Sequence, residues 1–331
     1  MKIAIIGGGW LGCHIASKLL ADQHNVHVYE QSSIFSGASF YNQNRLHKGF
    51  HYSRNQKTRK LCYDTFDLFL EDYHHLVEPI QNNYYAIPTD KSLIDYGTFK
   101  TIFKQEEVPF TECTIDWLEN IEGSVVVDER YINPVKAQQH FDSLLKTNLI
   151  IKDIDQKELV ELSKDYDYVI NVTNNKLKTI ANTYYELSLT LVYNKTPGTS
   201  FGSLTMVDGP LFSIYPYRAD QYTLTDVEYT PVYINDDLEE LEKFKRTTLT
   251  GDKIDSIRNE MEAKVRSYYK RFKADFNYLH YYTSTKVKRA STSADRSPII
   301  KQEGNIISCV SGKIQGIYTL ENYIKNEIAR R

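Results

Sequence analysis

The 331-residue chain has little cysteine and no long apolar run. Its four cysteines, Cys13, Cys62, Cys113 and Cys309, form no CxxC pair and have no metal-binding spacing, so neither a disulfide framework nor a metal site is indicated. No apolar run is long enough to span a membrane, and the first predicted strand begins directly after Met1, which predicts no signal peptide. We therefore expect reduced thiols and a cytoplasmic protein.

An excess of positive charge is also missing. The chain has 40 Lys and Arg against 43 Asp and Glu, a net charge of −3. Nucleic acids and anionic lipids are usually bound by a basic surface, so the sequence predicts neither as a partner. We expect a small-molecule substrate. The 26 tyrosines suit polar-edged pockets but are not diagnostic of a function. The length indicates about two domains, and nothing in the composition indicates an oligomeric state.

The first thirty residues predict a strand, a glycine turn, a helix and a second strand. Lys2–Ile6 is a short apolar run typical of a buried strand. It leads into GGGWLG, in which Gly7, Gly9 and Gly12 have the G-x-G-x-x-G spacing of dinucleotide-binding proteins. In that motif the first glycine permits a tight turn, the second admits a pyrophosphate, and the third lets helix and strand pack closely. The helix start directs free N–H groups at the phosphates.

The second strand, Asn25–Tyr29, ends at Glu30. A carboxylate at this point accepts hydrogen bonds from both ribose hydroxyls and disfavours a 2′-phosphate, so NADP is not expected. We expect Trp10 and Leu11 at the helix start, and Gln31 beside the acidic residue, to contact the same nucleotide. This fingerprint by itself leaves NAD and FAD open.

The stretch that follows favours FAD. Residues Gln31–Arg54 are too polar for a core strand and too long for a simple connection, and long structured loops are usually functional. Such a segment suits an extended cofactor that continues beyond its pyrophosphate, as FAD does. Along it we expect Ser39, Asn44 and Leu46 to contact the cofactor.

The rest of the chain predicts an α/β fold with two domains. A Rossmann-like FAD-binding domain with a parallel sheet is expected over residues 1–85, 125–183 and 284–331. A second, substrate domain, built on an antiparallel sheet with helices, is expected over residues 86–124 and 184–283. The main predicted helices are Lys57–Val77, Pro134–Leu145 and Ile317–Ile328, with one or two more within Asp236–Phe276; the main predicted strands are Tyr84–Ile87, Val125–Val127, Leu149–Ile154, Tyr168–Val172 and Asn305–Val310.

Separated segments of the chain resemble the FAD-dependent oxidoreductases of the D-amino-acid oxidase and sarcosine oxidase superfamily. Residues 42–62, NQNRLHKGFHYSRNQKTRKLC, are similar to the "NSGVIHSGIYY…KAKLC" stretch of L-2-hydroxyglutarate dehydrogenases. The resemblance implies that His47 lies near the flavin. Asn44 and Arg45 stand where those enzymes carry small residues, and the pair is similar to a Thr-Arg pair beside the flavin in sarcosine oxidases.

Two later segments extend the resemblance. Tyr168–Thr173 (YVINVT) resembles a strand beside FAD that usually ends in Ala-Thr-Gly, which implies a cofactor contact at Thr173, with Asn174 in place of the glycine. Residues 311–324, SGKIQGIYTLENYI, resemble the flavin-contacting helix start of this superfamily and are also similar to a segment of UDP-galactopyranose mutases. This implies flavin contacts at Gly312, Lys313 and Ile314.

The function predicted from these parts is hydride transfer from a C–H bond of a small polar amine, amino acid or 2-hydroxy acid, possibly sugar-linked, to the flavin. Arg45, His47 and Lys313 are the candidate catalytic residues, and His51 and Tyr52 are secondary candidates. His47 is equally well explained as a structural histidine bonded to backbone.

Two alternatives remain open. One is a redox-neutral sugar-nucleotide mutase, whose diphosphate would need the basic residues Arg45, Lys48, Arg54 and Lys57. The other is a non-enzymatic dinucleotide-binding protein.

Overall fold

The structure is a computed structural model that describes residues 1–290 and 295–330, and it divides into two compact units. Unit 1 comprises Met1–Tyr41, Pro134–Tyr185 and Thr285–Arg331, and unit 2 comprises Asn42–Asn133 and Glu186–Ser284. Residues 42–85 and 125–133, which we expected in the FAD-binding domain, thus belong to unit 2. Residues 83–85 and 125–126 pair with strands of the large sheet of unit 2, at 203–205 and 111–112.

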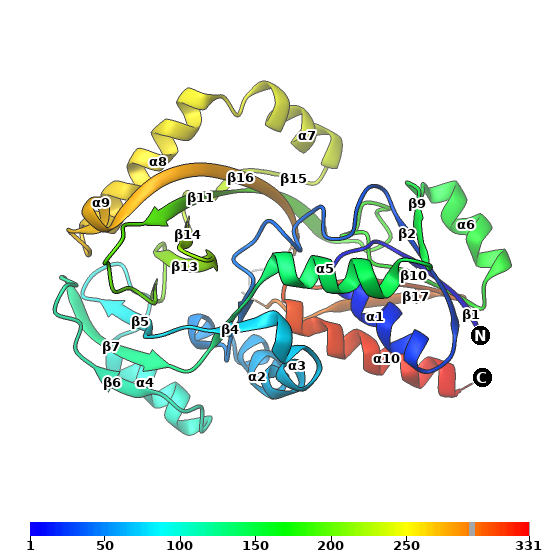
Figure 1. Ribbon diagram of the computed structural model, residues 1–331, viewed down its shortest axis with the longest axis horizontal. Helices are drawn as coiled ribbons and strands as arrows, with labels where there is room; N and C mark the ends of the chain where they lie inside the picture. The colour runs from blue at the N-terminus through cyan, green and yellow to red at the C-terminus, as the bar shows by residue number, and fades with distance from the viewer. Residues whose placement is uncertain (291–294, 331) are drawn as a thin grey trace. The chain divides into compact units, whose positions relative to one another are not determined.

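Unit 1 is built on a six-stranded sheet in the order β17-β18-β10-β1-β2-β9 (Figure 1). All neighbours pair in parallel except β17, which is antiparallel to β18. The strands are β1 (Lys2–Ile6), β2 (Asn25–Glu30), β9 (Leu149–Ile151), β10 (Tyr168–Asn171), β17 (Ile299–Glu303) and β18 (Ile306–Val310).

The register of this sheet brings four loops to one edge. Ile6 pairs with Tyr29 of β2 and with Asn171 of β10, which in turn pairs with Ser308 of β18. Since these strands are parallel, the residues that follow them leave the sheet at its carboxyl edge, where open α/β sheets bind their ligands.

Helices cover both faces of the sheet in unit 1. Leu159 of α6 packs with Ala4 and Ile6 of β1, whereas Ile5 points the other way, toward Gly12 of α1. This alternation follows from the two-residue period of a strand. The helices of unit 1 are α1 (Trp10–Ala21), α5 (Pro134–Leu145), α6 (Gln156–Asp165) and α10 (Ile317–Ala329), preceded by the 3-10 turn η3 (Ile314–Gly316).

Unit 2 contains a nine-stranded sheet in the order β15-β11-β14-β13-β12-β5-β7-β6, with β16 also paired to β11, and a small sheet β3-β8-β4. The strands of the large sheet are β5 (Asn83–Pro88), β6 (Thr111–Cys113), β7 (Ile121–Val127), β11 (Thr183–Lys195), β12 (Ser203–Met206), β13 (Phe212–Arg218), β14 (Gln221–Asp226), β15 (Pro231–Asn235) and β16 (Phe276–Arg289). The small sheet consists of β3 (Arg45–Leu46), β4 (Val77–Pro79) and β8 (Arg130–Ile132).

The two faces of the large sheet differ in polarity. Ile254, Met261 and Val265 of α8 pack on one face against an apolar cluster that includes Leu204 and Ile214. The opposite face carries Ser, Thr and Tyr side chains of β5, β12, β13 and β14, which are nevertheless buried. The helices of unit 2 are α2 (Gln56–Asp64), α3 (Phe66–Tyr73), α4 (Tyr96–Gln105), α7 (Leu238–Thr247), α8 (Gly251–Arg266) and α9 (Phe272–Asp275), with 3-10 turns η1 (Phe50–Tyr52) and η2 (His74–Leu76).

The predicted elements differ from this structure in two regions. Within Asp236–Phe276, where one or two helices were expected, there are three, α7, α8 and the four-residue α9. The single helix expected over Lys57–Val77 is two helices, α2 and α3, followed by η2 and β4. The break falls at Thr65, whose hydroxyl donates a hydrogen bond to the carbonyl oxygen of Leu61 at 2.6 Å. A threonine that bonds back to the preceding turn competes with regular helix geometry.

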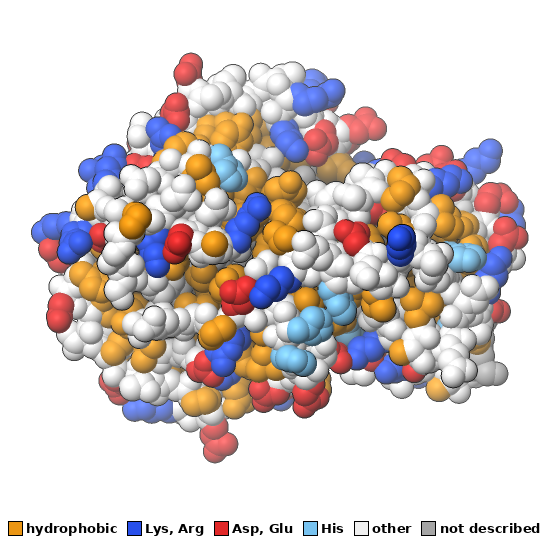
Figure 2. Space-filling model, in the orientation of Figure 1, with side chains coloured by type: hydrophobic (Ala, Val, Ile, Leu, Met, Phe, Trp, Pro, Cys, Tyr) orange, Lys and Arg blue, Asp and Glu red, His pale blue; other side chains and the backbone are white. Residues whose placement is uncertain are grey.

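The face of the molecule in Figure 2 is mixed in charge. Figure 2 shows Lys and Arg side chains interspersed with Asp and Glu on the face that it draws, without a large patch of one sign. Within residues 1–290 and 295–330, no helix is long and apolar enough to cross a membrane.

Candidate functional site: a nucleotide cradle and a polar cluster

The turn after β1 has a backbone that only glycine permits. Gly7 has φ of +114°, and its N–H donates to the carbonyl oxygen of Tyr29 at 2.8 Å. A Cβ on Gly7 would lie 2.7 Å from the carbonyl oxygen of Val172, and one on Gly12 would overlap the carbonyl oxygen of Gly7. The motif glycines are therefore required by local packing in unit 1 itself.

The start of α1 provides an anion-binding end. Gly9 is the N-cap and supplies no capping side chain. The N–H of Trp10 donates to Oγ of Ser39 at 3.0 Å, and a Cβ on Gly9 would lie 2.7 Å from the same oxygen. The Ser39 hydroxyl keeps its own hydrogen for an anion placed at the helix start, where the dipole also favours negative charge.

The side chains at the start of α1 are structural. The Trp10 indole is buried, with ring centroids 5.1 Å from Phe35 and 5.5 Å from Phe141, and Leu11 is half-buried. If Trp10 contacts a nucleotide, it does so through its backbone.

Glu30 closes the cradle at the end of β2. Its buried carboxylate accepts hydrogen bonds from the N–H of Gly8 at 2.7 Å and of Ser32 at 3.1 Å. A carboxylate has about four acceptor positions, so both oxygens can also accept from hydroxyls. The adjacent Gln31 is exposed, and its Oε1 accepts from Lys176, which is paired with Asp153 at 2.6 Å.

The loop after β10 lies against the glycine turn. The backbone N of Thr173 is 3.3 Å from the position of a Cβ on Gly7, and the Thr173 hydroxyl donates to Oδ1 of Asn171 at 2.8 Å. Asn174 has φ of +55°. Asparagine tolerates this left-handed region, so it can stand where the related strands have glycine.

The loop after β18 is a tight turn. Oγ of Ser311 accepts from the N–H of Lys313 at 3.3 Å and donates to the Lys313 carbonyl oxygen at 2.8 Å. A Cβ on Gly312 would lie 3.1 Å from the Arg296 side chain. Lys313 caps the 3-10 turn η3, so Gly312, Lys313 and Ile314 meet α10 through this turn rather than directly.

Unit 1 therefore fits a dinucleotide such as FAD. A turn that requires glycine, a helix start whose N-cap residue has no side chain, and a carboxylate with spare acceptor positions lie at one edge of its sheet. These are the features that bind pyrophosphate and ribose.

In unit 2, Arg45 lies on the polar face of the large sheet. Its guanidinium donates to Oε1 of Gln43 from Nε at 3.0 Å and from Nη2 at 2.9 Å, to Oγ1 of Thr205 at 2.9 Å, and to Oγ of Ser213. It also stacks over the ring of Tyr215 at 3.9 Å from the centroid. Every partner of this cation among the described residues is neutral.

The neighbours of Arg45 in sequence are held by the same unit. Asn44 is buried with φ of +46°, and its amide donates to the carbonyl oxygen of Asn42 at 3.1 Å. Leu46 is fully buried in β3.

His47 is 1% exposed. Its Nδ1 accepts the N–H of Gly49 at 3.1 Å, which places the hydrogen of the neutral ring on Nε2, 3.9 Å from Sγ of Cys62. This set of contacts matches the structural alternative that the sequence left open for His47.

A buried carboxylate, Glu129, lies beside this cluster and was not foreseen. It accepts hydrogen bonds from the N–H of Lys48 at 2.7 Å, the amide of Asn83 at 2.9 Å and the hydroxyl of Tyr85 at 2.9 Å. Burial raises the pKa of Glu129, although these hydrogen bonds and the charge of Arg45 act in the opposite direction.

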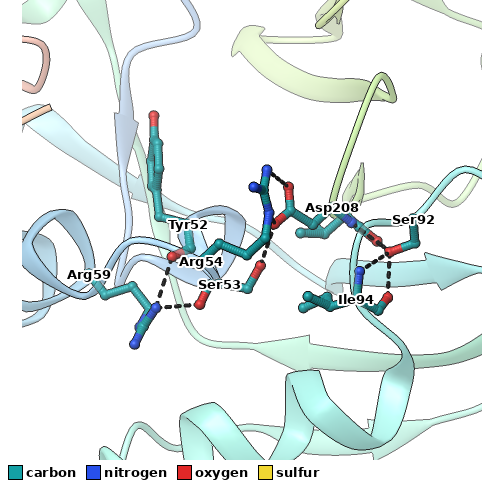
Figure 3. A network of polar contacts seen from close by, with 8 residues as sticks. Tyr52, Ser53, Arg54, Arg59, Ser92, Ile94 and Asp208 are labelled. Atoms are coloured by element: carbon teal, nitrogen blue, oxygen red, sulfur yellow. Dashed lines mark hydrogen bonds and ion pairs between the residues drawn. The ribbon is translucent and has the colours of Figure 1, made fainter. Parts of the chain in front are cut away.

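Three basic residues considered for a diphosphate are engaged in different ways. Figure 3 shows Arg54 turned toward Asp208, at 2.6 Å from Nε to Oδ2. Lys48 lies over the ring of Phe66 at 4.6 Å, and Lys57 is exposed. Arg54, Lys48 and Arg45 thus have different contacts and do not form one basic cluster around a shared partner.

Comparisons with known proteins settle the family. A sequence model described as FAD dependent oxidoreductase matches residues 2–95. The chain is 35% identical over 329 residues to the FAD-dependent monooxygenase FPY4 of Fusarium mangiferae, covering 96% of this chain and 88% of the relative. The protein belongs to the FAD-dependent oxidoreductases.

Two further comparisons agree. The FAD-dependent monooxygenase kojA of Aspergillus flavus is 24% identical over 372 residues, covering 100% of this chain and 87% of the relative. The structure of glycine oxidase from Geobacillus kaustophilus has a TM-score of 0.70 at 10% identity, covering 100% of this chain and 95% of that one, which shows a shared fold. The recognised superfamily, the α/β fold, the enzyme class and FAD as the cofactor are thereby confirmed.

The predicted FAD contacts of this oxidoreductase fall into two groups. Unit 1 brings together Gly7, Gly9, Gly12, Glu30, Ser39 and Thr173. Gly312, Lys313 and Ile314 lie in the turn after β18, a parallel strand of the same sheet. Asn44, Arg45, Leu46 and His47 lie in unit 2.

Sequence reasoning missed the partners of Arg45 and the buried Glu129. One signal was available, because Ser203 and Thr205, Ser213 and Tyr215, and Thr223 alternate with apolar residues along β12, β13 and β14. That period indicates a sheet with a polar second face. Glu129 had no such signal, since DER at 128–130 reads as a surface turn.

Proposed function

We propose that this FAD-dependent oxidoreductase oxidises a small amine, amino acid or 2-hydroxy acid, possibly sugar-linked, by hydride transfer from a substrate C–H bond. Bound FAD supplies the two-electron acceptor. Unit 1 is assigned to the cofactor and unit 2 to the substrate. The observation that carries the proposal is Arg45, a half-buried cation whose contacts on a polar sheet face are all neutral.

Arg45 favours an anionic substrate. A guanidinium has five N–H donors, and four hydrogen bonds go to Gln43, Thr205 and Ser213. Among residues 1–290 and 295–330, one donor and the full positive charge remain for a further group. Stacking on Tyr215 offsets only part of the desolvation of a cation. A substrate carboxylate completes this environment, which points to an amino acid or a 2-hydroxy acid.

The other two candidate catalytic residues receive narrower roles. We assign His47 to positioning the backbone at Gly49, because its ring is buried between the Gly49 N–H and Cys62. Lys313, at the tight turn after β18, is assigned to charge stabilisation at the cofactor. The side chains of Asn44 and Leu46 are buried, so we assign their predicted FAD contacts to the backbone.

A second candidate function is oxygen insertion. Two sequence relatives that span nearly the whole chain are named FAD-dependent monooxygenases. The mutase alternative has less support, since Arg54 is paired with Asp208 and Lys48 lies over Phe66.

The deciding experiment is anaerobic mixing of FAD-loaded protein with a panel of amines, amino acids and 2-hydroxy acids while flavin absorbance is followed. Bleaching by a compound of this class supports the proposal. If none bleaches the flavin, but the aerobic protein supplied with NADH or NADPH as reductant incorporates one isotopically labelled oxygen atom from O₂ into a product, the monooxygenase candidate replaces it. Turnover only after chemical reduction, without net redox change, would favour the mutase.

A further inference from the structure

A chain of three hydrogen-bonding side chains lies beside the Arg45 cluster in unit 2. Nδ1 of the half-buried His51 is 3.2 Å from the hydroxyl oxygen of Tyr85, and the rings are parallel within 7°. The Tyr85 hydroxyl is 2.9 Å from Oε2 of Glu129. Tyr85 and Glu129 are fully buried, so the chain runs from a partly accessible imidazole to a carboxylate without access to water.

The donors in this chain have a defined order. Glu129 accepts from Lys48 and Asn83 as well as Tyr85, which is the pattern of a carboxylate acting as acceptor on both oxygens. The hydroxyl hydrogen of Tyr85 therefore points at Glu129, and its oxygen is left to accept from His51. The neutral ring of His51 then carries hydrogen on Nδ1 and a lone pair on Nε2.

We propose that Glu129 and Tyr85 position His51 as the proton acceptor of the oxidation, with Nε2 as the accepting atom. This inference rests on the proposed function. When the substrate is oxidised, its O–H or N–H bond breaks, the proton forms a bond to Nε2, and the electron pair becomes the second bond of C=O or C=N. The C–H electron pair leaves as the hydride that is transferred in the proposed oxidation.

The three side chains of His51, Tyr85 and Glu129 form a relay, which lies next to the anion site proposed at Arg45. Tyr85 and Thr205 are paired residues of β5 and β12, and Thr205 accepts a hydrogen bond from Arg45. An anionic group at Arg45 would thus be held within the same cluster as His51. The negative charge of Glu129 stabilises the imidazolium that proton transfer forms, as the third member of a triad does.

Other titratable or charged groups surround this site and contribute to its titration. The His47 ring centroid is 4.2 Å from that of His51 and the Tyr52 centroid is 4.4 Å away. The charged groups nearby are the pairs Arg54–Asp208 and Arg59–Glu106, with Arg45 acting on Tyr85 and Glu129. His47 has the opposite tautomer, with hydrogen on Nε2, so the two histidines are distinguishable.

The test is ring-nitrogen NMR of the FAD-loaded protein across pH, with His51→Gln used for assignment. We expect hydrogen on Nδ1 of neutral His51, and a titration midpoint lower by about half a pH unit in Glu129→Gln, because an opposite charge is removed. Tyr85→Phe should abolish the tautomer preference. Tyr193→Phe is the matched control, since it removes another buried tyrosine hydroxyl bonded to a glutamate, Glu262 at 2.9 Å, in the same unit.

Hydrogen on Nε2 of wild-type His51, or an unchanged midpoint and tautomer in either folded variant, overturns the proposal. Should one variant fail to fold, the other decides. The acid limb of the pH profile for flavin bleaching should move with the midpoint in Glu129→Gln. If the NMR result holds but no small substrate bleaches the flavin, the proposed function fails and the relay does not.

Discussion

The two units of the molecule present chemistry in different ways. In unit 1 the candidate site is mostly main chain, arranged around glycines such as Gly7 and Gly12, whose Cβ atoms would strike neighbouring backbone. In unit 2 it is made of side chains from several segments, among them Arg45, Tyr85, Glu129 and Thr205. The difference teaches that the first site depends mainly on its glycines and on a few side chains close to them, such as Glu30 and Ser39. The second depends on a connected set of polar side chains.

The largest effect is expected from Gly12→Ala in unit 1. The added Cβ overlaps the carbonyl oxygen of Gly7, so α1 must move away from β1. We expect a loss of unfolding free energy of about 3 kcal/mol and no retained FAD. Gly37→Ala is the control, because no heavy atom lies within 4 Å of its Cβ position. Urea unfolding and flavin absorbance measure both, and equal behaviour of the two variants would refute the main-chain account.

Glu129→Ala is the corresponding change in unit 2. It leaves the Lys48 N–H, the Asn83 amide and the Tyr85 hydroxyl without their acceptor in a buried site. Unsatisfied buried donors should lower the free energy of unfolding by about 3 kcal/mol. Glu71→Ala, at an exposed position of α3, serves as control in the same urea titration. A Glu129 variant as stable as the control would show that the hydrogen bonds accepted by Glu129 do not stabilise unit 2.

Glu30→Gln separates charge from packing at the nucleotide cradle. The amide keeps the shape of the side chain but loses the charge-assisted hydrogen bonds to ribose and to the Gly8 N–H. We expect FAD to bind about tenfold more weakly, which corresponds to about 1.4 kcal/mol. Flavin fluorescence titration of the stripped protein measures this, with the exposed Glu161→Gln of α6 as control. Equal affinity in both would remove Glu30 from the adenosine site.

The smallest effect is expected where α1 meets α10. Glu321 contacts Nε2 of His14 at 2.9 Å and Lys325 at 2.7 Å, and the hydrogen bond from His14 lowers the pKa of Glu321 to about 2. A carboxyl group whose pKa is lowered by folding stabilises the protein at pH values above its ordinary pKa. That stabilisation is lost as the pH falls toward 2. Glu321→Gln should therefore lower the unfolding free energy by about 1 kcal/mol at neutral pH.

The difference between wild type and Glu321→Gln should narrow progressively below about pH 4.5 in urea titrations. A gap that stays constant over this range would mean that the ion pair is not its source.

The two units also differ in what their sequence reveals. The cradle could be predicted because its residues are close in sequence and glycine is forced by backbone geometry, as at Gly7 and Gly12. The partners of Arg45 could not, because Thr205 and Ser213 lie more than 150 residues away and meet it only through sheet pairing. His47 was singled out by resemblance, yet His51, four residues later, has the hydrogen bond to the buried relay.

The most direct test compares FAD affinity and flavin bleaching in Arg45→Lys and Glu30→Gln. Lysine keeps the charge of Arg45 but cannot reproduce its fork of hydrogen bonds to Gln43, Thr205 and Ser213. If unit 1 holds the cofactor and unit 2 the substrate, Arg45→Lys retains wild-type FAD affinity and slows substrate-driven bleaching by about tenfold or more. Glu30→Gln should weaken FAD binding but, at saturating FAD, leave the rate of substrate-driven bleaching unchanged. A loss of FAD affinity in Arg45→Lys as large as in Glu30→Gln, with unchanged bleaching, would contradict this division of labour.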